Sequence, residues 1–563
     1  MMAIVERICA HADRMGERLA VTFLNDGENN RTFVTYRQLI DGANSYATAF
    51  AERSLFKERV VIALPPGPEF IFAFLGGLIS GAIPVPVPPL RSRDNRSWSR
   101  MDAVIQDCEA SAVVSTTELA KVRATYGGLS ANLPWLVSGE VEGGSNPAFD
   151  PPRANSVAFL QYTSGSTAEP KGVVVRHENL ESNIGAICAK LSVDDESIAV
   201  GWLPMHHDMG LIGGVLTGLY RGIGLILMSP LHFVQKPSRW LRAISEFRAT
   251  HSGGPNFAYD ACVSRISPVE AESLDLSSWR CAVAGAEPVR PESIDRFCKK
   301  FARAKFDKRS FYPCYGLAEA TLIVAGGDGR RSPVVNAFDR RELAKDNAVL
   351  ATSAHCLNLV GSGSAAADHE IAIVNPETRL RCPDGRIGEL WVRGPSVASG
   401  YWRASAECAE NFGVHMASGD TQFLRTGDLG FIHQNELYLV GRQKDVIITY
   451  GRKIHPQDVE RTVEALVTGA RFGSAAAFLD GQYGSESLVI VLEVRDFGSE
   501  TVATIVKTIV TKVATAHEVR PNRIALVASH RIPRTTSGKL RRAEARAMLA
   551  RGDFELLGQH VVV

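Results

Sequence analysis

Two patterns of hydrophobic and polar positions alternate along the first part of the chain. Short runs of β-branched and other apolar residues, at 59–65, 82–88 and 111–116, are typical of buried strands. Longer stretches at 69–80 and 238–249 repeat their apolar residues with the spacing of an amphipathic helix. Because such strands alternate with such helices, we expect an α/β fold built on parallel or mixed sheets.

A β-rich subdomain is predicted at about 360–443. From about residue 376 onward, turns that contain Gly, Pro and Asp separate short apolar runs such as IGELWVRG, LYLVG and DVIITY. Short strands joined by close turns produce this pattern.

The C-terminal part of the chain has its own pattern. An amphipathic helical stretch at 455–466 precedes the strand-like runs SAAAFL and SLVIVLEV, a second helical stretch at 501–516 and the strand-like run RIALVA. We place a boundary near Arg442–Asp445. The sequence thus predicts a large N-terminal domain of α/β layers over 1–443 and a small α+β domain over 444–563.

Composition narrows the class of protein. Of the 563 residues 22% are charged and the net charge is +1, so the chain lacks the basic excess of a nucleic-acid-binding protein. The net charge does not exclude a local patch of basic residues. The ten cysteines include no C-x-x-C pair, which favours buried thiols in a reducing compartment over disulfides or zinc. The N-terminus lacks the regions of a signal peptide. We therefore expect a cytoplasmic protein with no nucleic-acid partner.

One segment, LIGGVLTGLYRGIGLILM at 211–228, has the hydrophobicity of a membrane span. Arg221 and five glycines interrupt it. We therefore predict a buried strand and helix there, and no stable membrane insertion.

The loop TSGSTAEPKG at 163–172 is chemically suited to hold a polyphosphate. Its small residues let backbone N–H groups approach phosphate oxygens, its hydroxyls add donors, and Lys171 adds a positive charge. It is not a Walker A loop, because Pro170 precedes the lysine, Gly172 follows it, and the apolar run VVV comes next. On composition alone an ordinary turn remains the alternative. The string GSGSAA at 361–366 matches a dinucleotide fingerprint in letters only, since no helical pattern follows it.

The full string YTSGSTAEPKG at 162–172 resembles the ATP loop of the adenylate-forming superfamily: acyl- and aryl-CoA synthetases, luciferases, adenylation domains of nonribosomal peptide synthesis and fatty acyl-AMP ligases. Five further motifs of the superfamily follow in its order: AGAEPV at 284–289, YGLAEATL at 315–322, LRTGDLG at 424–430, GRQKDVIITYGRKIHPQDVE at 441–460 and PRTTSGKLRR at 533–542. The resemblance covers essentially the whole chain and implies ATP and Mg²⁺ as cofactors.

The resemblance also implies roles for individual residues. It implies that ATP is bound by the phosphate loop and by the adenine and ribose motifs: Thr163, Ser164, Gly165, Ser166, Thr167, Lys171, Gly285, Ala286, Glu287, Tyr315, Gly316, Leu317, Asp428 and Arg442. By the same resemblance Tyr315 would stack on adenine, and Asp428 with Arg442 would contact the ribose. Glu319 would act in catalysis as the Mg²⁺ ligand, with Thr163 as a second one. Without the motif, neither Tyr315 nor Glu319 would indicate a site, because a single Tyr is usually a core residue and a single Glu is usually exposed to solvent.

Two lysines near and beyond the domain boundary receive roles from the same resemblance. Lys539 lies in a basic, glycine-containing loop and would be an exposed lysine if taken alone, but in the motif it is the catalytic lysine. A carboxylate must approach an anionic α-phosphate, and positive charge from Lys539, Lys171 and Mg²⁺ would lower that barrier. Because Lys539 lies on the small domain, that domain must be mobile and close over the site, with Lys444 as the hinge.

Several strings resemble one subgroup, the fatty acyl-AMP ligases: GWLPMHHDMGLIGGVL at 201–216, SPLHFVQKPSRWLRAIS at 229–245, GGPNFAYDAC at 253–262 and AEAT at 318–321. In that subgroup the residue at His207 lines the carboxylate end of the fatty acid, so we expect it in the catalytic site. Residues around Gly210–Gly214 and Gly253–Tyr259 would form the acyl channel, with ordinary core packing as the alternative. The adjacent histidines and Asp208 lack a convincing zinc spacing.

The polar segment 326–356 lies between two well-patterned regions and is either a plain surface loop or an insertion with a function. Fatty acyl-AMP ligases carry an insertion at this place that packs against the small domain and disfavours CoA; NAFDRRELA at 336–344 resembles its core. The resemblance thus implies a fatty acid and a holo acyl carrier protein as partners, at the start of polyketide or lipopeptide synthesis. An acyl-CoA synthetase and a non-catalytic nucleotide- or lipid-binding homologue remain the alternatives.

Overall fold

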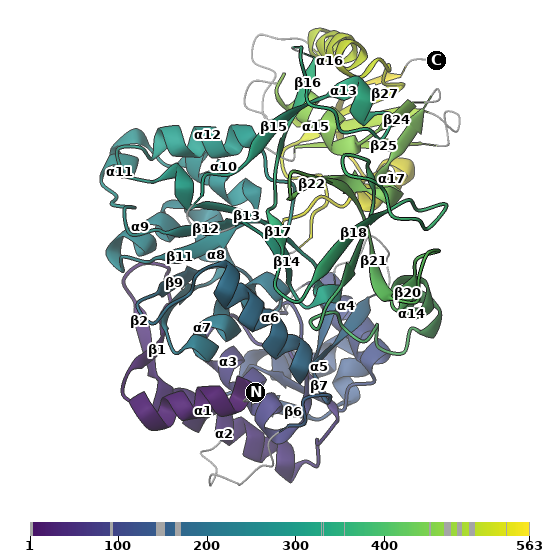
Figure 1. The fold of residues 1–563 in the computed structure, drawn as a ribbon. Helices are drawn as coiled ribbons and strands as arrows, with labels where there is room; N and C mark the ends of the chain where they lie inside the picture. Colours follow the sequence, from purple (N-terminus) through teal and green to yellow (C-terminus); the bar gives the residue numbers. More distant parts are fainter. Residues whose placement is uncertain are drawn as a thin grey trace.

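The computed structural model describes most of the chain, in these ranges: 4–90, 94–141, 152–163, 170–327, 329, 331–353, 355–449, 452–466, 474–480, 487–494, 502–535 and 538–561. We keep the name large domain for the residues up to 443 and small domain for those from 444; this division stays a prediction. The small domain, green-yellow to yellow in Figure 1, lies at one end of the molecule.

A mixed sheet forms the centre of the large domain. In the described residues its strands follow the order β17-β14-β13-β12-β11-β9-β10-β1-β2. The six inner strands pair in parallel, whereas β2, β14 and β17 at the edges pair antiparallel. The strands are β1 Leu19–Leu24, β2 Arg31–Thr35, β9 Ile198–Gly201, β10 Gly224–Met228, β11 His251–Gly254, β12 Cys281–Ala284, β13 Phe311–Gly316, β14 Ile323–Gly326 and β17 Ser364–Ala365. The expected α/β fold with a mixed sheet is confirmed.

Helices cover both faces of this sheet (Figure 1). One apolar core joins α1 Ile4–Met15, α2 Tyr36–Glu52, α3 Pro68–Ser80, α6 His177–Lys190, the π-helix η2 Met209–Leu216 and α7 Thr217–Arg221. A second, aromatic-rich core joins α8 Pro230–Gln235, α9 Ser238–Glu246, α10 Asn256–Arg265, α11 Pro268–Glu272 and α12 Pro291–Lys300; the short 3-10 turn η3 Lys308–Ser310 precedes β13.

Helix α3 differs from the amphipathic helix that its sequence predicted. Every residue from Phe70 to Ser80 is buried except Phe72, which is partly buried. The reason is that both of its sides are covered: a Cβ on Gly76 would touch Tyr46 of α2, and one on Gly77 would touch Pro84. A helix that is apolar all round is a core helix.

A second, smaller sheet lies beside the first. Its order is β4-β3-β5-β6, all parallel, and its members are β3 Arg59–Ile62, β4 Ile83–Pro86, β5 Ala112–Ser115 and β6 Trp135–Val137, with α4 Asn95–Cys108, α5 Thr117–Tyr126 and the 3-10 turn η1 Leu129–Asn132. The antiparallel hairpin of β7 Val157–Thr163 and β8 Lys171–Arg176 joins the core of this sheet through Leu160. The strand β8 thus follows the phosphate-type loop. A Walker A loop would be followed by a helix, so the structure agrees with the prediction that this loop is not one.

The predicted β-rich subdomain contains one antiparallel sheet. Its strands are β18 Glu370–Val374, β19 Gly388–Arg393, β20 Val414–His415, β21 Gln422–His433 and β22 Glu436–Arg442, with α14 Ser405–Asn411 beside them. The segment 326–356 adds β15 Val335–Asp339 and the short helix α13 Arg340–Leu343, and β15 pairs with β16 Cys356–Val360. Phe338 of β15 is fully buried against Phe431 and Tyr438, so the segment is folded onto the subdomain and is not a plain surface loop.

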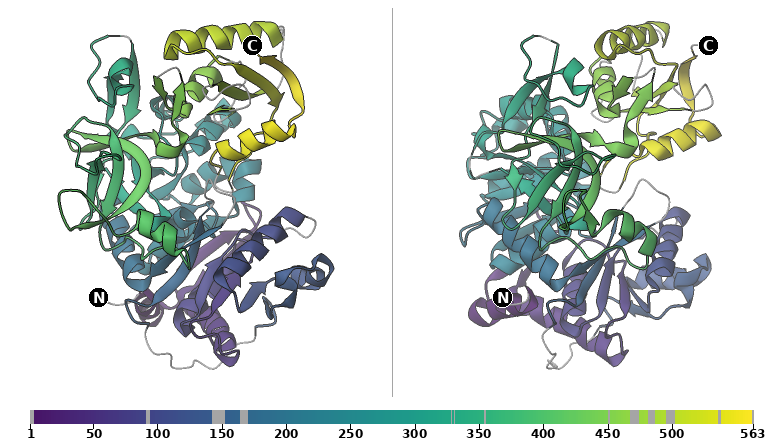
Figure 2. Two further views of the ribbon diagram at one scale, coloured as in Figure 1. Left: turned by 90° about the vertical axis from the view of Figure 1, so that its right-hand side faces the viewer. Right: turned by 45° about the vertical axis from the view of Figure 1, so that its right-hand side comes forward.

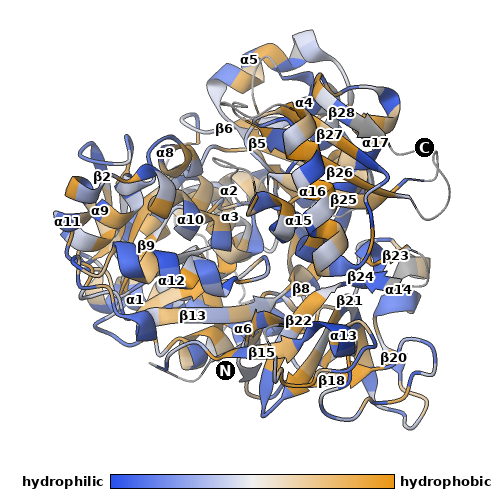
Figure 3. Ribbon diagram, turned by 90° about the horizontal axis from the view of Figure 1, so that it is seen from above, coloured by the Kyte–Doolittle hydropathy of each residue, from blue (hydrophilic) through white to orange (hydrophobic). Residues whose placement is uncertain are grey.

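In the described residues, the small domain packs three helices and a hairpin around a four-stranded sheet of order β25-β26-β27-β28. Its elements are β23 Ile447–Thr449, β24 Arg452–Ile454, α15 Pro456–Glu464, β25 Ala475–Leu479, β26 Leu488–Val494, α16 Val502–His517, β27 Arg523–Ala528, α17 Arg542–Arg551 and β28 Leu556–Val561. Its strands are largely orange in the hydropathy view of Figure 3 and form its core. The sequence predicted α15, α16 and three of these strands, but missed α17 and β28.

The membrane-like segment 211–228 continues from η2 through α7 into β10. It is therefore helix and strand, as predicted from its interrupting residues. In the described part of the chain no helix has the length and apolar character needed to cross a bilayer.

Candidate active site

A large cavity, about 860 Å³, lies at the carboxyl ends of the parallel strands β9, β11, β12 and β13. This edge is where open α/β sheets place ligands. Its wall also includes residues of the β-rich subdomain, such as Asp428, and of the small domain, such as Lys539. The small domain lies at one end of the large domain in both views of Figure 2, and residues of both domains line the cavity, so the site is built from two parts of the chain.

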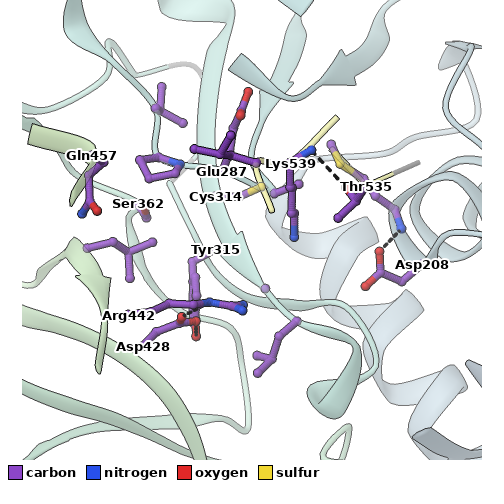
Figure 4. A pocket seen from close by; sticks show the side chains of 18 of the residues that line it. Asp208, Glu287, Cys314, Tyr315, Ser362, Asp428, Arg442, Gln457, Thr535 and Lys539 are labelled. Atoms are coloured by element: carbon purple, nitrogen blue, oxygen red, sulfur yellow. Dashed lines mark hydrogen bonds and ion pairs between the residues drawn. The ribbon is translucent and has the colours of Figure 1, made fainter. Parts of the chain in front are cut away.

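At one side of the cavity, Tyr315, Asp428 and Arg442 form a hydrogen-bonded cluster (Figure 4). The hydroxyl of Tyr315 donates to Oδ2 of Asp428 at 2.7 Å, and Nε of Arg442 donates to its Oδ1 at 3.0 Å. Tyr315 is the next-to-last residue of β13, and Asp428 pairs with Arg442 across the β21–β22 hairpin. Burial, together with the charge of Asp428, raises the pKa of Tyr315 well above its usual value. Residues of three separate motifs therefore meet here, while the nucleotide contacts that the resemblance implies for them stay a prediction.

The turn after β12 forms the neighbouring wall. Ala286 has φ +64°, a left-handed conformation that costs energy for a residue with a side chain. The carboxylate of Glu287 accepts a 2.7 Å hydrogen bond from the backbone N–H of Phe257, and burial raises the pKa of Glu287 to about 7. Gly285 departs from the prediction: it is buried behind the cavity wall, where a Cβ would lie 2.9 Å from Sγ of Cys314.

Gly316 and Leu317 follow Tyr315 and line the cavity. A Cβ on Gly316 would lie 1.9 Å from the carbonyl oxygen of Leu322. Only glycine therefore permits the tight return of the chain, through the 3-10 turn η4 Ala318–Ala320, that presents Glu319 to the cavity.

The phosphate-type loop is described only at its base. Thr163 and Lys171 are register partners across the β7–β8 hairpin, and Ser164, Gly165, Ser166 and Thr167 lie outside the described residues. Nζ of Lys171 lies 5.6 Å from the centre of the Tyr401 ring, and the Tyr401 hydroxyl donates to Oε1 of Glu319 at 2.8 Å. Tyr401 thus stands between the lysine and the glutamate of two separate motifs.

Sequence reasoning missed Tyr401. It lies in the string GYW, a few residues before α14, and this string has neither strand nor helix periodicity. The segment reaches the site because it runs along β8: the N–H of Val174 donates to the carbonyl of Gly400 at 2.9 Å, and the N–H of Trp402 to that of Gly172 at 2.7 Å. No pattern within the sequence of this segment could have predicted its pairing with β8.

Asp208 lies on the far side of the cavity, near Lys539 (Figure 4). Its Oδ1 is 2.6 Å from Nδ1 of His207. Burial acts to raise the pKa of Asp208, but its contact with His207 and the charge of Lys539 outweigh burial and lower the pKa overall. Burial lowers the pKa of the adjacent His206 to about 3, so this imidazole is neutral. In the described residues no three His, Cys, Asp or Glu side chains group as a metal site would require.

Lys539 is held at the cavity by its own loop and by the large domain. Its N–H donates to Oγ1 of Thr535 at 3.0 Å, and its carbonyl accepts from the N–H of Thr535 at 2.8 Å. Gly538 has φ +87°, and a Cβ there would lie 2.6 Å from the ring of Phe257. The lysine loop is therefore docked against the large domain in this structure.

Ion pairs join the small domain to the large domain and to the predicted hinge. Arg290, before α12, pairs with Glu464 of α15 at 3.1 Å, and both side chains are largely buried. Arg542 binds Glu460 through two 2.7 Å contacts and Asp445 through a third at 2.9 Å. Asp445 ends the 3-10 turn η5 Gln443–Asp445, in which Lys444 is exposed. The start of α17 is thus tied to the turn that holds the predicted hinge.

The segment 326–356 also contacts the small domain. Asp346 pairs with Lys453 of β24 at 2.7 Å, and Arg341 of α13 lies 3.8 Å from Glu518, directly after α16. Helix α13 is blue in Figure 3, since its residues are mostly charged. The segment therefore bridges the subdomain below it and the small domain beside it.

An apolar arm of the cavity extends from His207 along the central sheet. Its wall contains small and apolar residues of α6 and the position directly after it, of β9, η2, β10, β11 and β12, and of the turn before β14: Ile187, Leu191, Ala199, Gly201, Gly210, Gly213, Gly214, Val215, Leu227, Gly253, Val283 and Leu322. Of the predicted stretch Gly253–Tyr259, only Gly253 lines the cavity. Tyr259 lies in the aromatic core, where its hydroxyl donates to the carbonyl of Val283.

The chain matches known protein families and sequences. The profile of the AMP-binding enzyme family matches residues 9–402, and a profile described as Disco-interacting protein 2-like, AMP domain, matches residues 444–559. The chain is similar to JamA, a medium-chain fatty acid–acyl carrier protein ligase of Moorena producens (36% identity over 96% of this chain and 93% of that one). It is also similar to TtuA of Teredinibacter turnerae, which is likewise a medium-chain fatty acid–acyl carrier protein ligase (34% identity over 97% of this chain and 93% of that one).

One similar solved structure contains ligands. It is a fatty acyl-adenylate ligase of Legionella pneumophila in complex with acyl adenylate and pyrophosphate. That chain has 35% identity and a TM-score of 0.77, over 99% of this chain and 98% of its own.

Proposed function

Since the chain belongs to the AMP-binding enzyme family, we propose that it activates a fatty acid with ATP and passes the acyl group to the phosphopantetheine thiol of an acyl carrier protein. The observation that carries the proposal is one continuous cavity. It joins the cluster of Tyr315, Asp428 and Arg442 to Lys539 and to the apolar arm. A nucleotide, a reacting carboxylate and an alkyl chain each find a matching environment in it.

In the first step, a carboxylate oxygen of the fatty acid attacks the α-phosphorus of ATP. The bond from that phosphorus to the β-phosphate oxygen breaks, and pyrophosphate leaves with the electron pair. Negative charge grows on the α-phosphate oxygens, and Lys539 beside Asp208 is positioned to stabilise it. Tyr315 and Asp428 would hold the adenosine, while Lys171 would bind the leaving phosphates.

Glu319 and Thr163 are the residues that would hold Mg²⁺. A carboxylate and a hydroxyl oxygen suit this cation, which binds few protein ligands and completes its shell with phosphates and water. The hydrogen bond from Tyr401 fixes one oxygen of Glu319, which orients the carboxylate. When bound, Mg²⁺ would neutralise charge on the phosphates of ATP.

In the second step, the carrier thiolate attacks the acyl carbonyl carbon, a carbon–sulfur bond forms, and AMP leaves with the carboxyl oxygen that bonded it. Lys444 would absorb the domain rotation between the two steps. The contacts of Asp346 and Arg341 with the small domain support the idea that segment 326–356 restricts this rotation and disfavours CoA. All ten cysteines are free thiols, which supports a reducing compartment such as the cytoplasm.

The experiment is mass spectrometry of the products formed from ATP, Mg²⁺ and a panel of fatty acids, with CoA in one arm and a holo acyl carrier protein in the other. We expect acyl-adenylate alone with CoA, and an acylated carrier in the second arm. Acyl-CoA at a comparable rate would contradict the carrier assignment and favour an acyl-CoA synthetase. No adenylate from any acid would contradict the catalytic function itself.

A further inference from the structure

The apolar arm runs along one face of two neighbouring strands in the middle of the central sheet. Strands β9 and β11 pair in parallel, with Ala199 opposite His251 and Val200 opposite Ser252. Because side chains alternate between faces along a strand, Ala199, Gly201 and His251 share a face. Ser252 belongs to the other face, where its hydroxyl accepts from Trp240 Nε1 at 2.7 Å.

Small residues occupy part of this face, with the side chains of Leu227 and Val283 beside them. Ala199, Gly201 and Gly253 are only partly buried, although their strands are central in the sheet. On the opposite wall, a Cβ on Gly214 of η2 would meet nothing closer than 3.8 Å. These small residues therefore line the part of the cavity between the sheet and η2, where we place the alkyl chain.

His251 is the large residue at the end of that face. It begins β11, whereas Gly253 lies near the carboxyl end, where the nucleotide part of the cavity begins. Its ring is hydrogen-bonded on both sides: Nδ1 lies 2.8 Å from Oγ1 of Thr250, and Nε2 lies 2.9 Å from the carbonyl oxygen of Leu191, directly after α6. The ring thus reaches from the sheet to the end of α6, on the side of the arm farthest from His207.

We propose that His251 closes the far end of the apolar arm and sets the longest acyl chain that the protein accepts; this rests on the proposed function. A ring held by two hydrogen bonds and only 7% exposed cannot swing aside without leaving polar atoms unpaired in apolar surroundings. An unbranched side chain such as Met would yield to a longer substrate, but this ring does not.

The experiment compares chain-length limits in three variants. Each full-length protein is given ATP, Mg²⁺ and saturated acids from hexanoate to octadecanoate, and kcat/KM for adenylate formation is measured. One methylene in an apolar pocket discriminates by roughly 10- to 200-fold. We therefore expect His251→Ala to raise kcat/KM at least about 10-fold for acids just beyond the wild-type limit, relative to the best wild-type acid.

The second variant tests whether the size of the His251 ring or its hydrogen bonds set the limit. The third variant tests whether the acyl chain runs along the face of Ala199. His251→Phe keeps the bulk of the ring and should keep the wild-type limit. Ala199→Leu fills the face directly beside His251 and should move the limit to shorter acids. The matched control is His11→Ala, because His11 is equally buried and bonded to the carbonyl of Tyr220 but does not line the cavity.

An unchanged limit in a His251→Ala protein with wild-type thermal stability would overturn the proposal. So would an unchanged limit in Ala199→Leu, which decides the matter if His251→Ala fails to fold. If the wild type forms no adenylate from any acid, the proposed function fails instead. Displacement of a fluorescent fatty acid by the same panel then reads the chain-length limit without turnover.

Discussion

The hydroxyl of Tyr401 donates a 2.8 Å hydrogen bond to Oε1 of Glu319, a residue 82 positions earlier in the chain. The face of the same ring lies 5.6 Å from Nζ of Lys171. One aromatic side chain therefore contacts both the residue that would bind Mg²⁺ and the lysine that would bind phosphate. Its hydroxyl and its ring serve different partners, so they can be tested separately.

Tyr401→Phe should weaken the use of ATP while the ring contact with Lys171 remains. A hydrogen bond to a charged group contributes about 1.5–3 kcal/mol, which corresponds to roughly a 10- to 100-fold loss in kcat/KM for ATP. The Mg²⁺ concentration for half-maximal activity should rise as well. Pyrophosphate exchange across a Mg²⁺ titration measures both. Tyr220→Phe, which removes a hydroxyl bonded to Arg7 far from the cavity, is the control and should leave both values unchanged.

Lys539→Ala should abolish adenylate formation while ATP still binds. The nucleotide would contact Tyr315 and Asp428, which this change leaves in place, whereas the charge at the α-phosphate is lost. Removal of one electrostatic contact to a transition state costs about 10²–10³ in kcat. Calorimetry of ATP binding and pyrophosphate exchange give the two values. Lys512→Ala, an exposed lysine of α16, should retain full activity; persistent adenylate formation in Lys539→Ala would contradict its role.

Release of segment 326–356 from the small domain should increase the use of CoA. Deleting the segment would expose the core around Phe338, so two point changes are the sharper test. In Asp346→Ala combined with Arg341→Ala, both ion pairs to the small domain are lost. We expect more acyl-CoA than the wild type makes, measured by mass spectrometry. Lys345→Ala is the control, since Lys345 pairs within the segment with Glu342; equal refusal of CoA by all three proteins would mean that the segment is not the barrier.

Folding stability should decrease as the pH rises from about 5 to about 7, in part because of Glu464. Burial raises its pKa to about 7 in the folded protein, above the value of about 4.3 in an unfolded chain. Between these values the folded state binds more protons than the unfolded state, so its stability is greatest at low pH and falls as the pH increases.

Glu464→Gln should flatten this pH dependence, because the amide resembles the protonated acid and cannot titrate. One unit of pKa difference corresponds to about 1.4 kcal/mol, so the effect should be measurable in urea unfolding curves. Curves at several pH values between 5 and 7.5 test it. If the wild type and the variant lose the same stability over this range, another group is responsible.

The phosphate-type hairpin and the Tyr315 motif could be predicted because each is a short contiguous string. Their turns depend on neighbouring residues, such as the glycine at 316, which alone permits the return of the chain. The alternation of short apolar runs with helical stretches likewise predicted the α/β layers, since burial of a strand or of a helix face leaves its period in the sequence. The same pattern predicted that α3 is amphipathic, whereas most of α3 is buried. Periodicity does not reveal whether other elements also cover the outer side of a helix.

The sequence by itself determined the class of fold, the identity of the motifs and the chemistry that their residues can perform, because these depend on local conformation and side-chain type. Only the tertiary structure decided that Tyr401 meets Glu319, that Ala199 lies beside His251, and that Asp346 reaches Lys453. Such contacts join residues from separate elements. They depend on which strands pair and which surfaces pack, and neither choice leaves a periodic signal in either segment alone.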